Sequence, residues 1–379
     1  MRVCLIQEVL PKYRVPLFDA LGRADGIELE LWAGSTSFSG ALDASEPTDG
    51  FTFRSVSVRA VGPMVLQPSQ LKAALGRFDA VILPWRPRSP ELGLAVAIAR
   101  LRGVRVVLWG HGFSKEDSRA RTFLRDRLGR AADACVFYNR TAARRAIERG
   151  LPAERTYVAL NAIDQAPIQA ATDRWQRDPA RLAAFRAEHD VDPERTVLFV
   201  SRLKSAKRVD RLLTAFASVV ARRPRARLVV VGKGESREQL GELADRLGIA
   251  DQVTFTGALY EEEDLAPWFL SAGVFAYPTQ IGLSILHAFG YGLPVVTSDS
   301  RSDHGPEIEA LEPGVNGLTY RDGDPGDLAA RIGELLDDPS RRTALTCGAR
   351  ATVAEGGFTL SQTVAGFVAA LRGSGDGTT

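Results

Sequence analysis

Short apolar runs alternate along the chain with longer stretches in which apolar residues recur every three or four positions. Runs of the first kind predict buried β-strands, and stretches of the second kind predict amphipathic helices that cover a sheet. In the first half, the predicted strands are residues 2–6, 27–33, 79–83, 104–109, 134–138 and 156–160. Strands that alternate with helices in this way indicate a parallel α/β sheet.

The alternation stops after residue 170 and restarts at residue 196. Residues 171–195 are polar and helix-prone and end at a proline, Pro193, which disfavours helix at the preceding residue, so we predict an interdomain linker there. A second set of strands follows at 196–200, 227–231, 253–256, 274–277 and 295–298, with a helix over 210–221. The pattern therefore predicts two Rossmann-like α/β domains, 1–170 and 196–352.

The last periodic segment, 353–372, is predicted to be one amphipathic helix. Its apolar positions are Leu360, Val364, Phe367, Val368 and Leu371. We expect this helix to pack back toward the first domain. The Gly- and Ser-rich tail, 373–379, is predicted to be disordered.

Composition fits a two-domain enzyme, since 379 residues are long for one core and 45% apolar residues can fill two. No apolar run approaches the roughly 20 residues that a membrane-spanning helix needs. The N-terminus lacks the pattern of a signal peptide. Three scattered cysteines without metal-ligand spacing are typical of a cytoplasmic protein, which is our expectation here.

Charge is shared unevenly: residues 1–170 carry 24 Lys and Arg against 17 Asp and Glu, and the remainder carries 24 against 29. The segment 115–149 alone has ten basic and five acidic residues. A basic surface is suited to attract anionic lipid or a phosphorylated acceptor. We favour a merely solvated face for 115–149, and peripheral contact with the inner membrane face is the alternative.

Ligands of open α/β sheets bind at the carboxyl ends of the strands, so residues that follow the predicted strands are the functional candidates. The strand 196–200 leads into a loop that carries Arg202 and Lys207. Arginine offers a planar fork and lysine a compact charge, which together can neutralise a diphosphate without a metal. Surface charge explains either residue alone, but the pair at a strand end favours a phosphate site.

Two glycine-bearing loops support this interpretation. Gly232 and Gly234 follow the next strand, where they let the backbone approach a ligand or simply make a turn. The stretch 278–296 places a glycine loop before a helix whose first amides can hold an anion, and Gly292 and Pro294 end that helix before a strand. This layout is typical of a phosphate cradle. No Walker loop or dinucleotide fingerprint is present.

Taken in order, the segments 201–207, 231–234, 255–257, 278–296 and 306–318 closely resemble the donor-binding domain of family-4 retaining glycosyltransferases. The resemblance covers 196–320 well and implies the GT-B fold, in which two Rossmann-like domains face each other across a cleft. It implies that Arg202 and Lys207 grip the donor diphosphate and act as catalytic residues. The implied donor-binding residues are Gly232, Thr256, Gly257, Thr279, Gly282, Leu283, Ser284, His287 and Glu307.

The first half resembles the family more loosely. His111 follows the strand 104–109, where family members commonly have a histidine that touches the transferred sugar, so the resemblance implies a third catalytic residue there. A histidine that only satisfies a turn is the alternative. The loop after the first strand carries Lys12, Tyr13 and Arg14 where many relatives have a glycine pair, and we assign these three residues to the acceptor side.

One departure from the family concerns its pair of glutamates, which falls on Thr279 and His287 in this chain. In the family, the first glutamate approaches the sugar and the second accepts hydrogen bonds from ribose hydroxyls. Neutral histidine can accept one bond and donate another, and threonine offers one hydroxyl. The resemblance thus describes an atypical member whose diphosphate grip is kept.

We therefore expect a metal-independent, retaining transferase that moves a sugar from a nucleoside diphosphate sugar to a hydroxyl acceptor. A glycan, a lipid-linked acceptor and a natural product all fit this acceptor. The donor is a co-substrate, and no cofactor or nucleic-acid partner is expected. Asp322 and Asp324 lie in a late Gly/Pro loop, and we reject them as a metal site. Two rival hypotheses are a nucleotide-sugar epimerase or hydrolase of the same fold and a non-catalytic sugar-nucleotide-binding protein.

Overall fold

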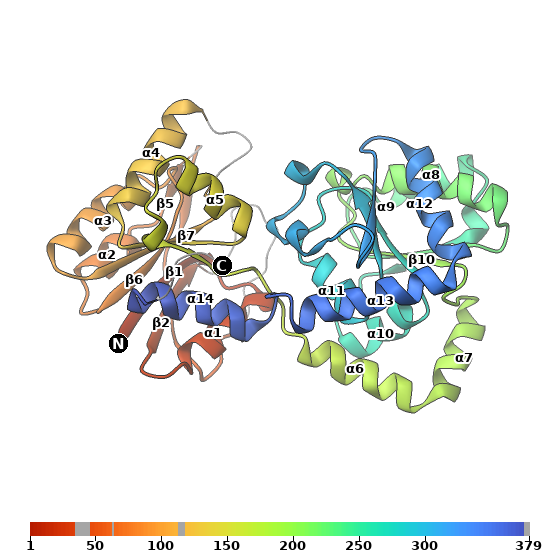
Figure 1. Cartoon of the computed structure of the whole chain (residues 1–379), viewed down its shortest axis with the longest axis horizontal. Helices are drawn as coiled ribbons and strands as arrows, with labels where there is room; N and C mark the ends of the chain where they lie inside the picture. Colours follow the sequence, from red (N-terminus) through yellow and green to blue (C-terminus); the bar gives the residue numbers. More distant parts are fainter. Residues whose placement is uncertain (35–45, 63, 113–117, 375–379) are drawn as a thin grey trace. The chain divides into compact units, whose positions relative to one another are not determined.

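A computed structural model describes residues 1–34, 46–62, 64–112 and 118–374 and divides the chain into two compact units (Figure 1). Unit 1 comprises Met1–Ile163 and Leu360–Thr379, and unit 2 comprises Asp164–Thr359. Each unit is an α/β sheet covered by helices. Unit 1 is therefore built from both ends of the chain.

In unit 1, seven parallel strands form one sheet in the order β3-β2-β1-β6-β7-β8-β9 within the described residues. The strands are β1 (Arg2–Val9), β2 (Glu28–Gly34), β3 (Thr52–Ser55), β6 (Ala80–Pro84), β7 (Arg105–Gly110), β8 (Ala134–Phe137) and β9 (Thr156–Val158). The six strands predicted in this half are confirmed. The sequence missed β3 and the hairpin of β4 (Arg59–Val61) and β5 (Met64–Leu66), because these short strands are mostly exposed and lack an apolar run.

Helices cover both faces of this sheet, and the alternation of side chains along β1 shows why. Val3 and Leu5 belong to one apolar cluster, and Cys4 and Ile6 belong to another on the opposite face. The helices of the unit are α1 (Val15–Gly22), α2 (Ser69–Leu75), α3 (Glu91–Leu101), α4 (Arg119–Ala131), α5 (Arg140–Glu148) and α14 (Leu360–Arg372). Helices α1 and α14 contribute to the first cluster, and α2, α3 and α5 contribute to the second.

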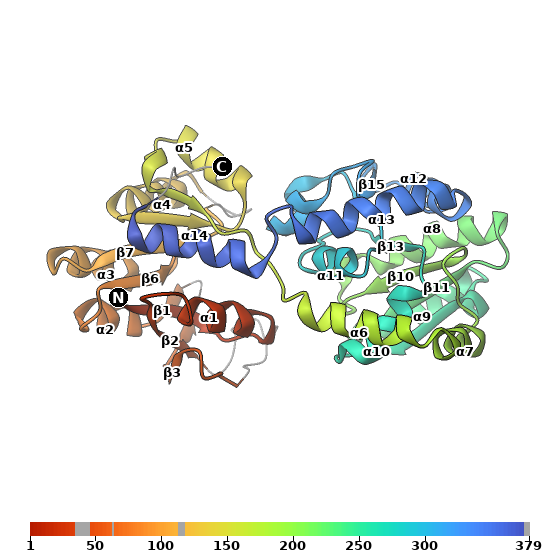
Figure 2. The same ribbon diagram turned by 60° about the horizontal axis from the view of Figure 1, so that its bottom comes forward.

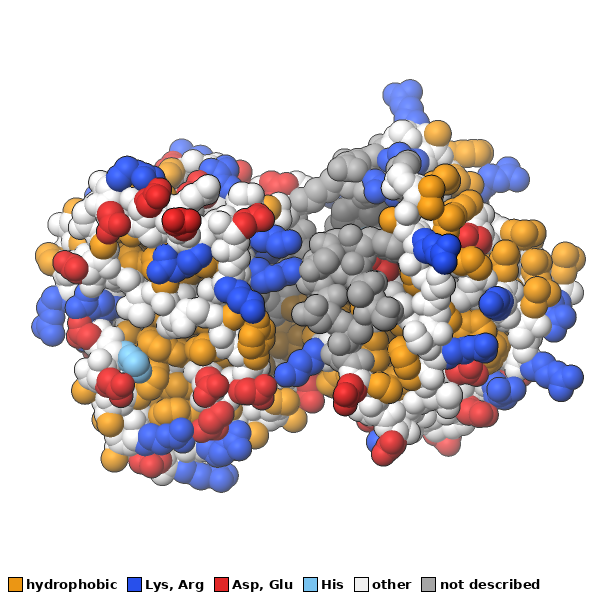
Figure 3. Space-filling model, turned by 180° about the vertical axis from the view of Figure 1, so that it is seen from behind, with side chains coloured by type: hydrophobic (Ala, Val, Ile, Leu, Met, Phe, Trp, Pro, Cys, Tyr) orange, Lys and Arg blue, Asp and Glu red, His pale blue; other side chains and the backbone are white. Residues whose placement is uncertain are grey.

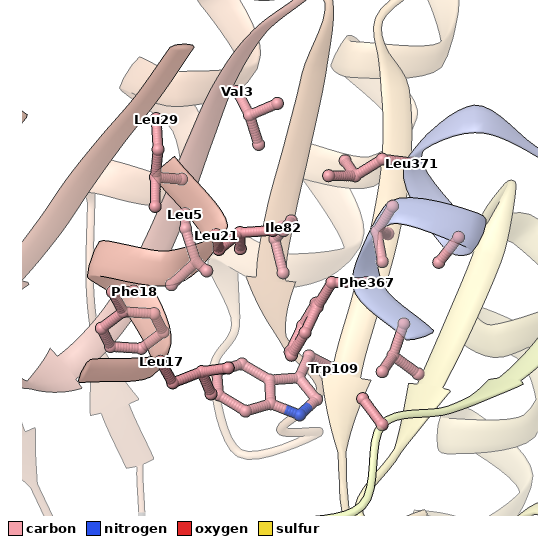
Figure 4. Packing of buried hydrophobic residues seen from close by; sticks show 14 of the residues in the cluster. Val3, Leu5, Leu17, Phe18, Leu21, Leu29, Ile82, Trp109, Phe367 and Leu371 are labelled. Atoms are coloured by element: carbon pink, nitrogen blue, oxygen red, sulfur yellow. The ribbon is translucent and has the colours of Figure 1, made fainter. Parts of the chain in front are cut away.

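The helix α14 completes the first of these clusters (Figure 4). Phe367 is fully buried, and its ring meets the ring of Trp109 edge-on, with centroids 4.8 Å apart. The Thr363 hydroxyl donates to the carbonyl of Leu160 (2.6 Å), and Arg105 Nε donates to the carbonyl of Ala370 (2.9 Å). The C-terminal segment is thus part of the core of unit 1.

In unit 2, six parallel strands follow the order β12-β11-β10-β13-β14-β15 within the described residues. The strands are β10 (Thr196–Val200), β11 (Arg227–Val231), β12 (Val253–Gly257), β13 (Val274–Tyr277), β14 (Val295–Ser298) and β15 (Gly317–Tyr320). The five predicted strands are confirmed, and β15 is an addition. The helices that cover this sheet are α8 (Val209–Arg222), α9 (Arg237–Arg246), α10 (Glu262–Leu270), α11 (Ser284–Gly290), α12 (Pro325–Asp337) and α13 (Pro339–Ala354).

The structure places most of the predicted linker in two helices of unit 2, α6 (Ala166–Arg177) and α7 (Pro179–His189) (Figure 2). Buried Ile168, Ala171 and Trp175 give α6 one apolar face, which a predominantly polar composition obscures. Trp175 Nε1 donates to the carbonyl of Glu263 at 3.0 Å, which ties α6 to α10.

Candidate functional site

In each sheet the strand order reverses next to the first strand, which creates a crevice at the carboxyl ends of two neighbouring strands. In unit 2 the reversal lies between β10 and β13, and in unit 1 it lies between β1 and β6. The loops that follow these four strands carry most of the residues singled out from the sequence.

In unit 2, a lysine joins the two loops of the reversal. Lys207 Nζ donates to the carbonyl of Gln280 at 2.7 Å and lies 5.3 Å from the centre of the Tyr277 ring. The Tyr277 hydroxyl in turn donates to Ser201 Oγ at 2.9 Å. The loop after β10 is thereby held against the loop after β13. Arg202 lies exposed on the same loop as Lys207.

A glycine lets the loop after β11 lie against the loop after β10. Gly232 has φ = 150°, and a Cβ at this position would lie 1.9 Å from the carbonyl oxygen of Ser201. Its amide donates to the carbonyl of Gly257 at 2.7 Å, next to Thr256 at the end of β12. Only glycine fits this close approach. The loop that begins at Gly232 is therefore hydrogen-bonded to the end of β12, where Thr256 and Gly257 lie.

A histidine that the sequence analysis missed fixes the loop before α11. His304 Nδ1 accepts a hydrogen bond from the amide of Ile281 at 3.2 Å, and His304 Nε2 lies 3.0 Å from the carbonyl of Ser298. The amide of Gly305 donates to the carbonyl of Ile281 at 2.7 Å. Because Nδ1 accepts and Nε2 faces a carbonyl, the contacts match a neutral imidazole with its proton on Nε2. In the sequence, nothing marks His304 for this role except its position two residues before Pro306.

The predicted donor residues Glu307 and Gly282 lie side by side. Glu307 is 4% exposed, and its Oε2 lies 3.5 Å from where a Cβ on Gly282 would be. Leu283 follows as the N-cap residue of α11, which begins at Ser284, and Thr279 is buried in the loop just after β13. The structure thus gathers the segment 279–284, Glu307 and Lys207 at one reversal point.

The predicted residue His287 points to the first turn of α10. Its Nε2 lies 3.0 Å from Glu262 Oε2, the oxygen to which the Tyr291 hydroxyl donates at 2.6 Å. Burial, followed by the negative charge of Glu262, raises the pKa of Tyr291. A carboxylate therefore lies beside position 287 although no glutamate stands at that position. The sequence analysis missed Glu262 because it lies 25 residues away along the chain.

In unit 1, residues around the reversal point line a cavity of about 530 Å³. Tyr13, Arg14 and His111 line it, whereas Lys12 is exposed and does not. Arg14 donates through Nη1 to Gln7 Oε1 at 2.6 Å and through Nη2 to the Tyr138 hydroxyl at 3.0 Å. These contacts fix the orientation of its guanidinium group.

His111 lies at the mouth of this cavity, with its ring centroid 4.4 Å from that of Tyr138. The residue keeps an exposed surface, but protein atoms crowd around its imidazole. This loss of water, followed by the positive charges of Arg14 and Arg86, lowers the pKa of His111 to about 4. The imidazole is therefore neutral at physiological pH and can accept a hydrogen bond.

Four further arginines that the sequence analysis missed line the same cavity: Arg86, Arg88, Arg121 and Arg125. They come from the segment after β6 and from α4, so no short motif contains them. Glu8 is the one acidic residue among the described lining residues, and it forms an ion pair with Arg86. The described lining of this cavity is thus rich in arginine.

The parts of the chain that the structure describes lack both a metal-binding cluster and a membrane-spanning helix. No group of three or more His, Cys, Asp or Glu residues there could hold a metal ion. Among the same residues, no helix is both long and apolar enough to cross a bilayer.

Comparisons with known proteins identify relatives of both halves. Residues 194–338 match the family "Glycosyl transferases group 1", and residues 17–162 match "Glycosyl transferase 4-like domain". The GDP-mannose-dependent alpha-(1-6)-phosphatidylinositol monomannoside mannosyltransferase of Mycobacterium tuberculosis is 30% identical over 361 residues, which is 91% of this chain and 89% of the relative. The D-inositol 3-phosphate glycosyltransferase of Thermobispora bispora is 36% identical over 184 residues, or 45% of this chain and 42% of the relative.

Among solved structures, Anabaena HepE in complex with UDP matches 99% of this chain and 100% of that chain, with a TM-score of 0.72 and 19% identity. A glycosyltransferase from Rickettsia africae matches 98% and 97%, with a TM-score of 0.70 and 13% identity. These likenesses confirm the predicted GT-B fold of two Rossmann-like sheets.

The depressed pKa of His111 is testable without an activity assay. We expect the imidazole of His111 to titrate near pH 4 when followed by NMR, with His111→Gln used to assign the signal. Replacing Arg14 with Gln removes a nearby positive charge, so the pKa should rise toward 6.5. Arg127→Gln is the control, because Arg127 does not line the cavity. A wild-type titration near 6.5 would contradict the described environment.

Proposed function

The chain belongs to the group 1 glycosyltransferases and transfers a sugar from a nucleotide sugar, and from this premise we propose that it moves a mannosyl residue from GDP-mannose to a hydroxyl group with retention at the anomeric carbon. The choice of donor rests on the Mycobacterium tuberculosis relative, which matches 91% of this chain and has GDP-mannose in its name. The assignment of the donor to unit 2 rests on one observation above all, the position of Lys207 between the two loops of the reversal.

We assign the donor diphosphate to the loops that Lys207 joins. Lys207 is held by the carbonyl of Gln280, and Arg202 lies on the same loop. Lys207 contacts the loop that leads through Gly282 to the first amides of α11, where an anion is favoured. Charge that develops on the departing phosphate thus meets groups already in place, so little reorganisation is needed during the reaction.

In the proposed step, the bond between the anomeric carbon and the diphosphate oxygen breaks, and its electron pair leaves with the diphosphate. The acceptor oxygen forms the new bond on the same face of the sugar. The proton of the acceptor hydroxyl passes to the phosphate oxygen that has just been released. The cations Arg202 and Lys207, the second of which the carbonyl of Gln280 holds, would supply the charge stabilisation that a metal supplies elsewhere, so we propose metal-independent transfer.

We propose that other polar groups replace the two family glutamates. Thr279 presents a hydroxyl just after β13, beside the glycine loop. His287 and Glu262 together present a hydrogen-bonded imidazole and carboxylate at the first turn of α10. A pair of this kind can both donate to and accept from the hydroxyls of a ribose. Thr256 and Gly257 are assigned to the nucleobase.

We assign the acceptor to the cavity of unit 1, whose volume is in the range of small-molecule sites. Neutral His111 at its mouth can accept a hydrogen bond from a sugar hydroxyl, which makes it the positioning group for the transferred sugar. Tyr13 and Arg14 line the cavity from the loop after β1.

We further propose that α4 contacts the inner membrane face, as a lipid-linked acceptor requires. Within the part of segment 115–149 that is described, Phe123 is 60% exposed and Leu124 is 45% exposed on a helix that also exposes Arg119 and Arg127. Figure 3 shows that basic, acidic and hydrophobic side chains are interspersed on the face of the molecule that it presents. Apolar side chains flanked by arginines favour an interfacial helix.

A donor panel tests the proposed function. We expect GDP-mannose to give the highest kcat/KM among GDP-, UDP- and ADP-linked hexoses, and the product to carry the α-linkage of the donor by NMR. Chelation of divalent ions should leave the rate unchanged, because the cations are side chains. Equal consumption of the donor with and without a hydroxyl acceptor would instead identify a hydrolase or an epimerase.

Replacement of Arg202 tests its assignment to the donor diphosphate. Arg202→Ala should lower kcat/KM for the nucleotide sugar by about 100-fold or more, because one fixed charge at the leaving group is lost. Lys204→Ala is the matched control, since Lys204 is an exposed cation of the same loop, and it should change kcat/KM by less than about twofold. An Arg202→Ala enzyme with unchanged kcat/KM would remove Arg202 from the diphosphate site.

The membrane contact is tested by co-sedimentation with vesicles. The wild-type protein should sediment with phosphatidylglycerol vesicles, and Phe123→Ser combined with Leu124→Ser should weaken the binding at least about tenfold, since apolar burial in the interface is lost. Leu101→Ser on α3 is the control, because Leu101 is 88% exposed outside α4. If all three proteins sediment alike, α4 is not the contact.

A further inference from the structure

We propose that unit 2 contains a second anion site, a cavity of about 310 Å³ that binds a small phosphate monoester through Arg342 and Arg350. The site goes beyond the proposed function, because it takes neither the donor nor the acceptor of the transferred sugar. The position of the cavity, the arrangement of its arginines, its charge and its lining support the assignment.

The cavity lies at the edge of the sheet opposite to the donor loops. Its lining includes Pro193, Gly273 and Pro294, which come shortly before β10, β13 and β14. Loops that precede parallel strands meet at the amino edge of a sheet, whereas the loop of Lys207 and the glycine loop follow strands at the carboxyl edge. The cavity is therefore separate from the place that we assign to the donor diphosphate.

Helix α13 supplies the basic side of the cavity and runs alongside α11 (Figure 1 and Figure 2). Its residues Arg342, Thr346 and Arg350 recur every four positions, so they share one face of the helix. A Cβ on Gly273 would lie 3.3 Å from Arg342 Cδ. A Cβ on Gly292 would lie 2.6 Å from Arg350 Nε. Each arginine thus extends over the backbone of a glycine.

The two glycines lie close together, because they lead into neighbouring strands. The amide of Phe275 on β13 donates to the carbonyl of Pro294, directly before β14, at 2.9 Å. Gly273 and Gly292 each stand two residues before one of these bonded partners. The two arginines of α13 therefore converge on one space at the amino ends of β13 and β14.

The charge of Arg342 is buried without an ion pair. The residue is 9% exposed, and Nη1 donates to the carbonyls of Leu335 and Leu336 at 2.7 Å and 2.9 Å. Within residues 1–34, 46–62, 64–112 and 118–374, Nε and Nη2 have no hydrogen-bond partner, and neither atom is fully enclosed. Burial of a charge that no opposite charge offsets is costly, and a bound anion would reduce this cost.

The surroundings of Arg342 add a second positive charge and no negative one. Arg350 forms no hydrogen bond or ion pair with any residue that the structure describes. None of the described residues that line the cavity is Asp or Glu. Two like charges that face the same space repel each other, and a bound anion offsets this repulsion.

The lining indicates the class of the anion. Guanidinium groups only donate hydrogen bonds, and the hydroxyl of Thr346 has no partner in the described part of the chain, so it can donate as well. A phosphate group has several acceptor oxygens and matches the planar fork of arginine. The other walls include Phe269, Leu293 and Pro339, which can cover a short carbon skeleton. The volume is at the lower end of small-molecule sites, which limits the ligand to a small monoester.

Amide NMR of the full chain with inorganic phosphate is the first test. Saturating GDP occupies the diphosphate position of unit 2, and ionic strength and pH are held constant. The amide signals of Gly273 and Gly292 report on the cavity, because the two arginines lie over these glycines. We expect both signals to shift saturably with phosphate. Arg350→Gln should weaken this binding at least about tenfold, since a charged donor is lost.

Arg341→Gln is the matched control. Arg341 is the neighbour of Arg342 on α13, but it is exposed, forms an ion pair with Glu334 and does not line the cavity. Its replacement should leave the phosphate affinity unchanged. Thr346→Val, which keeps the volume and removes one hydroxyl, should weaken binding by about threefold or more and avoids the loss of the bonds that Arg342 makes to α12.

A comparison of probes tests the class of ligand. Glycerol 3-phosphate should bind more tightly than inorganic phosphate, because its carbon atoms contact the apolar walls. Acetate should bind more weakly than either, because it offers fewer oxygens and less charge. Glycerol, which carries no charge, should leave the signals of Gly273 and Gly292 unchanged.

The site is overturned if phosphate causes no saturable shift of Gly273 and Gly292, or if Arg350→Gln and Arg341→Gln have equal effects. Acetate that binds as tightly as phosphate contradicts the choice of anion, and equal affinities of the two phosphates contradict the choice of an ester. None of these measurements requires turnover of GDP-mannose. Failure of the second anion site is therefore distinguishable from failure of the proposed function.

Discussion

The parallel direction of all strands in the two large sheets is the constraint on which both sites depend. Every strand ends at the same edge of its sheet, so the loops that follow strands meet there even when they are far apart in sequence. Where the strand order reverses, helices leave on opposite sides and a crevice remains between two loops. In unit 2 this crevice collects Lys207 and the loop after β13, to which we assign the donor diphosphate, and in unit 1 it collects five arginines and His111.

The fold could be predicted from the sequence because its strongest signals are local. Buried parallel strands are continuous apolar runs, and eleven of the strands were found in this way. The short strands β3, β4 and β5 have largely exposed residues, so their burial pattern carries no such signal. Helix α6 was not separated from a linker, since only four of its twelve residues are buried and half of the helix is polar or charged.

The candidate site divides in the same way between local and distant signals. Arg202, Lys207 and the segment 279–284 lie within loops that directly follow strands, and a reading of neighbouring residues finds them. His304 contacts Ile281, which is 23 positions away, and Glu262 contacts His287, which is 25 positions away. Only the fold brings these residues together. The arginines that line the cavity of unit 1 are likewise scattered over separate segments of the sequence. The sequence therefore showed only an excess of basic residues in 1–170 and not their concentration around one cavity.

The return of α14 to unit 1 has a consequence for the order of assembly. Phe367 packs on Trp109, and Trp109 is also a wall of the arginine cavity under the guanidinium of Arg14. All of unit 2 lies between these two parts of the chain. On the ribosome, unit 2 can fold as soon as its own residues emerge, whereas unit 1 must wait with an open apolar face until α14 has been translated. The proposed acceptor cavity is therefore the last part of the molecule whose walls can close, although most of its residues are synthesised first.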